Sequence, residues 1–132
     1  MEKEKLEKLI EYWLHGSVDE SEYMDILYKA GKYVPALFFL HLSTEKILKA
    51  FFVAEIEDYA PLTHNLLFLA QKSNLVLSKD FESFLVKLYP YNLITRYPED
   101  RNNLKETCTK VLATEFINKG KEFKEWLLAK MK

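Results

Sequence analysis

The sequence predicts an all-α protein, an up-and-down helical bundle of four to five helices. Apolar residues recur at the three- and four-residue spacing of helices through most of the chain. Glycine is scarce: its 3 residues in 132 stand far apart, which excludes glycine-rich nucleotide loops and makes a turn-rich β-sandwich improbable. Hydrophobic residues make up 48% of the chain, which is enough for one core. We therefore expect a single domain over residues 1–132.

The first helical region is expected between residue 2 and Gly31. Helical spacing is clear over residues 2–15, after which His15-Gly16-Ser17 is a candidate break. Asp19 or Ser21 could cap a second helix, so the pattern is compatible with one kinked helix or with two. Gly31 is expected to end the region, because glycine is common just past a helix C-terminus.

A central helix is expected over residues 33–54, with Pro35 in its first turn, where a missing N–H costs little. Apolar residues occupy most of its circumference, and its few polar positions are His41, Glu45, Lys46 and Lys49. A helix of this kind must be covered on several sides, by its own bundle or by a second subunit.

The remaining helices follow from caps and prolines. Thr63 is expected to cap a short helix, and Ser78 or Asp80 to begin another. Pro90 must stop or kink that helix, because proline lacks the N–H and clashes with the preceding turn. The last helix is expected to run without a break from about residue 102 to the end of the chain.

Charge is balanced overall but uneven along the chain. The formal net charge is −1, whereas residues 1–31 carry −4 and residues 110–132 carry +3. Two helices that lie side by side explain this pattern most simply, and acidic and basic arms for separate partners are the alternative. The overall balance does not suit a general polyanion binder.

The cysteine content and the hydropathy of the sequence limit the kinds of site and the cellular compartments that we expect for this protein. The single cysteine, Cys108, excludes an internal disulfide and a cysteine-built zinc site. It is expected to be a small buried or half-buried residue within the last helix rather than a nucleophile. No apolar run approaches the roughly 18 residues of a membrane span, and the N-terminus lacks the apolar region of a secretion signal. A cytoplasmic protein with no membrane contact is expected.

Three motifs follow one another along residues 31–98. The first is Gly31-Lys32-Tyr33 followed by Glu45-Lys46-Ile47-Leu48-Lys49-Ala50, the second is Thr63-His64-Asn65-Leu66, and the third is Arg96-Tyr97-Pro98. In this order they resemble the HEPN domain family, whose motifs are a Gly-x-Tyr…Glu-Lys-x-Leu-Lys-Ala helix, a Thr-His-Asp/Asn-Leu turn and an Arg-Tyr-Pro ending. The resemblance implies a helical bundle that usually dimerises. Many members are encoded beside a minimal nucleotidyltransferase, and some are toxin ribonucleases.

The ribonuclease motif of the family is only half present. It pairs an Arg, which stabilises phosphate charge, with a His four to six intervening residues later, which acts as acid or base. Arg96 matches the Arg, but Arg101, Asn102 and Asn103 occupy the positions of the His, and no histidine follows His64. No catalytic residue is therefore assigned.

Candidate contact residues for a ligand or partner are Arg96, Tyr97, Glu45, Lys46, Lys49 and His64. Arg96 supplies a bidentate fork and Tyr97 a stacking face for a phosphate or a partner. The alternative is an interhelical ion pair between Arg96 and a carboxylate such as Glu45.

The other candidates also have structural interpretations. Lys46 and Lys49 are expected to be solvated, with their stems covering apolar surface, and His64 is expected to bond within a capping turn. His41, Glu45 and His64 could form a three-ligand metal site, but no fourth ligand is evident. No metal and no cofactor are expected.

Three functions remain open at this point. The first is a catalytically degenerate HEPN-like binding protein that partners a minimal nucleotidyltransferase, in a toxin–antitoxin-like or nucleotide-handling pair. The second is a metal-independent ribonuclease toxin that uses Arg96 with another acid or base, and the third is a module that binds RNA or a nucleotide. The missing histidine favours the first.

A homodimer is expected, joined partly through the central helix and the segment around Pro90. Phe38, Phe39, Leu42 and Phe52 lie off the main apolar stripe of the central helix, and uncovered apolar area of this kind marks an interface.

Overall fold

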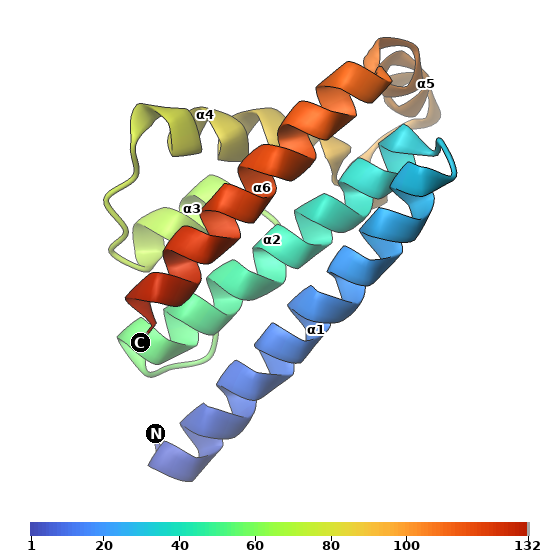
Figure 1. Cartoon of the computed structure of the whole chain (residues 1–132). Helices are drawn as coiled ribbons and strands as arrows, with labels where there is room; N and C mark the ends of the chain where they lie inside the picture. Colours follow the sequence, from blue (N-terminus) through green and yellow to red (C-terminus); the bar gives the residue numbers. More distant parts are fainter. Residues whose placement is uncertain (132) are drawn as a thin grey trace.

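The computed structural model describes residues 1–131, and these residues form helices and connecting loops without a strand (Figure 1). The elements, in chain order, are α1 (Lys3–Lys29), α2 (Tyr33–Ile56), α3 (Leu66–Lys72), α4 (Lys79–Leu88), the 3-10 turns η1 (Tyr89–Tyr91) and η2 (Leu93–Thr95), α5 (Pro98–Thr107) and α6 (Lys110–Lys130). The predicted all-α bundle is confirmed. No helix of the described part is long and apolar enough to cross a membrane.

Helix α1 is continuous, so the candidate break at residues 15–17 is wrong. Ser17 is buried against α2, where its hydroxyl donates to the Ser43 carbonyl at 2.9 Å and the Ser43 hydroxyl donates to the Ser17 carbonyl at 2.9 Å. Gly16 lies against the side chain of Lys46. The small residues that weaken an isolated helix here let two helices approach closely, and packing overrides local propensity. Gly31 follows the helix with a φ of +76°, as expected.

Helix α2 is the centre of the molecule, and its bounds confirm the expected central helix, with Pro35 in the first turn. Figure 1 shows α1 and α6 running alongside α2, and the shorter elements lie across its remaining side. Gly120 of α6 is buried at the contact with α2, where a β-carbon would lie 2.7 Å from Cδ1 of Leu40. The missing side chain therefore permits this close approach.

The oppositely charged ends of the chain do not pair with each other. Both α1 and α6 pack mainly against α2, and within residues 1–131 no ion pair joins them. Their polar link is a 2.5 Å hydrogen bond between the hydroxyls of Tyr28 and Thr114. The apolar surface of α2, rather than attraction between the ends, places the two helices.

The residue that caps α4 is one that the sequence predicts, whereas the residue that caps α3 is not. Of the two candidates, Ser78 and Asp80, it is Ser78 that caps α4 by accepting the N–H of Phe81 at 3.1 Å. Asn65, not Thr63, caps α3 by accepting the N–H of Phe68. Thr63 lies two residues too early and instead accepts the N–H of Asn65. Helix α4 ends at Leu88, in keeping with the effect expected of Pro90.

The last region contains two helices rather than the single helix expected from residue 102. Helix α5 ends at Thr107, and Thr109 caps α6 by accepting the N–H of Leu112 at 3.1 Å. Cys108 is buried as expected, but it lies in the break between the helices. Helix α5 itself contributes no buried residue.

Candidate functional site

A buried carboxylate, that of Glu45, organises the polar residues of α2. Its Oε2 atom lies 3.1 Å from Nζ of Lys49, and its Oε1 atom lies 2.8 Å from Nδ1 of His64. Glu45 and Lys49 stand one helical turn apart, and the loop that precedes α3 brings His64 to them. The structure thus places three of the predicted site residues in one cluster.

Lys49 is buried rather than solvated, with a side chain only 7% exposed. Its ammonium group lies 5.1 Å from the centre of the Trp13 ring, so α1 covers it. Sequence reasoning missed Trp13 as a partner. Its position on the apolar stripe of the first helix does not reveal which residue of α2 it faces.

His64 is a partner of Glu45 rather than a capping residue, because Asn65 takes the capping role. Its side chain is 42% exposed, so the cluster reaches the surface at His64. The carboxylate accepts the Nδ1–H of His64 and the ammonium of Lys49, and both oxygens of Glu45 are therefore engaged.

His41 lies one turn before Glu45 and is fully buried. Its Nδ1 is 3.9 Å from Glu45 Oε1, its ring centre is 6.0 Å from that of Tyr89, and no described residue hydrogen-bonds to either ring nitrogen. Burial and, secondarily, the charge of His64 lower the pKa of His41 to about 3. His41 is accordingly neutral at neutral pH.

The described residues include no group of three His, Cys, Asp or Glu side chains that could hold a metal ion. His41, Glu45 and His64 do lie near one another. However, Glu45 already binds Lys49, and His41 is 3.9 Å away, which is well beyond hydrogen-bond distance.

Arg96 and Tyr97 lie in extended backbone between η2 and α5. Arg96 is half-buried, its Nε atom is buried without a hydrogen-bond partner, and none of the described carboxylates pairs with it. The alternative ion pair between Arg96 and Glu45 is therefore wrong, because Glu45 binds Lys49 and His64 instead. The Tyr97 side chain is 74% exposed.

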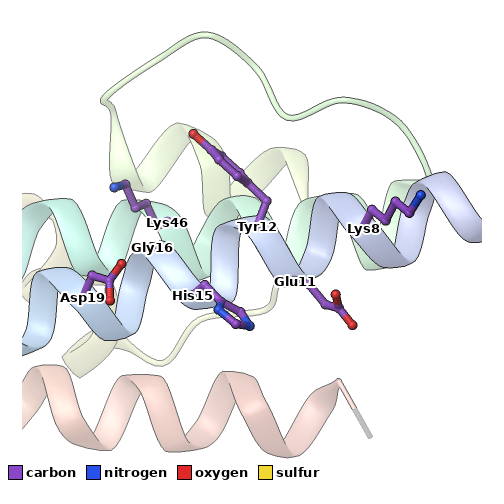
Figure 2. Close-up of a pocket in the computed structure, with 7 residues that line it drawn as sticks. All are labelled: Lys8, Glu11, Tyr12, His15, Gly16, Asp19 and Lys46. Atoms are coloured by element: carbon purple, nitrogen blue, oxygen red, sulfur yellow. The ribbon is translucent and has the colours of Figure 1, made fainter.

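Lys46 points to another side of α2 and forms an ion pair with Glu20 of α1. It borders a groove of about 540 Å³ along the outer face of α1. Figure 2 shows the residues that line it: Lys8, Glu11, Tyr12, His15, Gly16, Asp19 and Lys46. Glu11 and His15 point to one side of α1 and Tyr12 to the other (Figure 2), and the mixture of charges favours no single class of ligand.

The protein is an all-α bundle in which Glu45 and Lys49 are buried at the centre and the Arg-Tyr-Pro sequence leads into the penultimate helix, α5. The HEPN domain model matches residues 10–131, and the chain belongs to the HEPN domain family. This membership supports a nucleotide-binding or ribonuclease-like module. No curated protein and no solved structure matches the chain.

We predict that Glu45→Gln lowers the free energy of unfolding by about 3 kcal/mol or more, because it leaves the buried Lys49 charge without a counter-ion. Urea unfolding at pH 7 measures the change. Glu4→Gln is the matched control: Glu4 and Lys8 form an exposed pair at the same four-residue spacing, whose loss costs less than about 0.5 kcal/mol. Equal losses for the two variants would contradict the prediction.

A second prediction concerns pH. The unfolded chain protonates His41 near its ordinary pKa of 6.5, whereas the folded chain does so only near 3. Stability is therefore lost as the pH falls from 6.5 towards 3, and the loss from His41 amounts to about 2 kcal/mol at pH 5. His41→Phe keeps a ring beside Tyr89 and removes this contribution.

Urea unfolding of His41→Phe and of the wild type, at pH 7 and at pH 5, tests this. Between pH 7 and pH 5, the free energy of unfolding of His41→Phe should rise by about 2 kcal/mol relative to that of the wild type. His15→Phe, at an exposed position on α1, should show no such gain. A parallel pH dependence of His41→Phe and the wild type would disprove the prediction.

Proposed function

We propose that this protein is a HEPN binding protein without ribonuclease activity, which acts by contacting a partner. The observation that carries the proposal is that none of its 3 histidines stands at the position where Arg96 would need an acid or base. Ribonuclease chemistry of the family's kind requires a histidine within proton-transfer reach of the reacting hydroxyl.

The environment of each histidine supports this view. His41 is fully buried and neutral, and His64 is bonded to the carboxylate of Glu45. His15 lines the outer groove of α1. Residues 101–103, where the family's histidine would stand, are Arg101, Asn102 and Asn103, and none of these side chains takes up a proton from a hydroxyl near neutral pH.

The Arg96–Tyr97 segment is the proposed contact surface. The buried Nε of Arg96 has no partner within the described residues, and Tyr97 is exposed beside it. Arg and Tyr are the residue types that carry much of the affinity of protein interfaces. A minimal nucleotidyltransferase is the proposed partner, on the basis of the family resemblance, in a toxin–antitoxin-like or nucleotide-handling pair.

Two measurements test this function. The purified protein should leave single-stranded RNA intact. We also expect a minimal nucleotidyltransferase to be encoded beside this protein and to co-purify with it. Arg96→Ala should weaken that association at least about tenfold, as expected for loss of a central Arg. Lys87→Ala, at an exposed position of α4, is the control and should bind normally. RNA cleavage that disappears in Arg96→Ala would establish the ribonuclease alternative instead.

We also propose a homodimer, although over a smaller surface than the sequence suggests. Phe52 is buried within one chain, and Phe39 packs against the core, with its ring 5.5 Å from that of Tyr23. Phe38 and Leu42 of α2 remain half-buried. Beyond Pro90, Ile94 is exposed. A twofold axis is the commonest way to cover such residues.

Light scattering at micromolar concentration tests the dimer. We expect a mass of twice the 15.7 kDa of the chain, and we expect Leu42→Glu to reduce it to the monomer mass, because a charge in an apolar interface lacks a partner. Val86→Glu, at an exposed position of α4, should remain dimeric. A wild-type mass of 15.7 kDa that does not rise on concentration would contradict the proposal.

A further inference from the structure

A cavity of about 440 Å³ lies between the turn that joins α1 to α2 and the helix α5. Figure 1 shows α5 beside this turn at one end of the bundle. The described residues that line the cavity are Gly31, Lys32, Tyr33, Val34, Pro35, Arg101, Asn102, Lys105 and Cys108. Neither Arg96 nor Tyr97 is one of them, so this cavity is separate from the contact surface proposed above.

The charged residues of the lining all have the same sign. Lys32, Arg101 and Lys105 are cationic, and the described lining contains no Asp or Glu. Arg101 and Lys105 stand one turn apart on α5, an arrangement in which like charges destabilise a helix. Within residues 1–131, neither Lys32 nor Lys105 has an ion-pair partner. An anion in the cavity would relieve this repulsion.

Arg101 is held in place by the protein and keeps donors free. Its guanidinium donates one hydrogen bond to the carbonyl of Leu93, which fixes the side chain across the start of α5. A guanidinium carries five N–H donors in a planar fork that matches phosphate oxygens. Four of them remain after the bond to Leu93.

The backbone adds to the same electrostatic field. The N-terminus of the 24-residue helix α2 borders the cavity, and the side chain of its N-cap residue, Lys32, makes no capping hydrogen bond. The N–H groups of Tyr33 and Val34 have no partner within the helix, and the helix dipole favours an anion beside them. Burial raises the pKa of the Cys108 thiol, so this wall of the cavity carries no negative charge.

Size and shape indicate a small molecule. A volume of about 440 Å³ lies within the range of small-molecule pockets, roughly 300–1,000 Å³. Tyr33, Val34 and Pro35 supply an apolar wall next to the cationic one. Three positive charges exceed what one carboxylate requires and suit a phosphate monoester, with a charge of about −2, or a diphosphate, whose negative charge is higher.

We propose that this cavity binds a small phosphorylated ligand, whose phosphate is contacted by Lys32, Arg101 and Lys105. The site is formed within one chain, so it requires neither the dimer nor the partner proposed above.

Amide NMR spectra of the protein provide the test, because the chain has only 3 glycines and one of them lines the cavity. We expect the Gly31 resonance to shift on titration with pyrophosphate. The resonances of Gly16, on the groove of α1, and of Gly120, buried at the α2–α6 contact, should not move. Adenosine 5′-monophosphate and adenosine are the other two probes, and adenosine should cause no saturable shift of Gly31.

The double variant Lys32→Gln/Lys105→Gln should weaken pyrophosphate binding at least about tenfold, as expected when two charge-assisted contacts are lost. Lys29→Gln/Lys110→Gln removes the same charge from two exposed residues outside the lining, and it should bind as the wild type does. All four lysines are exposed, so both variants should keep the wild-type fold, which circular dichroism verifies.

Each outcome is decisive. Shifts with pyrophosphate alone assign the site to a free diphosphate, and shifts with adenosine 5′-monophosphate as well assign it to a phosphate ester, and either supports the proposal. A Gly31 resonance unmoved by millimolar pyrophosphate overturns it, as does equal weakening in the two double variants. Arg96→Ala should retain pyrophosphate binding, so failure of this site and failure of the proposed partner contact are distinguishable.

Discussion

The buried carboxylate of Glu45 is the constraint on which the centre of this bundle depends. Through Lys49 it reaches Trp13 of α1, and through His64 it reaches the loop before α3, so a single side chain connects three segments. A buried ion pair adds little net stability compared with apolar packing, but it tolerates few alternative arrangements because an unpaired buried charge is costly. In this chain it fixes how α1 and the loop are seated on α2.

At another contact between α1 and α2, the residues that meet are small and uncharged. Ser17 and Ser43 exchange hydrogen bonds across the contact, and the hydroxyls of Ser21 and Ser43 lie 2.7 Å apart. The side chain of Lys46 passes beside Gly16, where a β-carbon would lie 2.8 Å from its Cδ, and its ammonium group pairs with Glu20. Two neighbouring lysines of one motif, Lys46 and Lys49, therefore have different environments, one partly exposed and one buried.

The features that could be predicted from the sequence are the ones that local patterns determine. The central helix, the Ser78 cap and the end of α4 before Pro90 all follow from spacing and residue type within one or two turns. The continuity of α1 and the burial of Lys49 depend on which helix covers which face, and periodicity carries no such information. The break before Thr109 did have a local signal, the cap residue itself, but apolar spacing continues across it and conceals it. Among the candidate site residues, family motifs selected Glu45, Lys49 and His64 together, whereas their mutual geometry required the folded chain.

Helix α5 differs from every other α-helix described in having no buried residue. Among residues 98–107 only Leu104 packs against the core and the other side chains are exposed, so most substitutions in this helix change the free energy of unfolding by little. Substitutions at the exposed positions of α5 are therefore less limited by the loss of stability that commonly accompanies a gain of function. Within this bundle, α5 is thus the α-helix whose exposed surface can change most while the core stays the same.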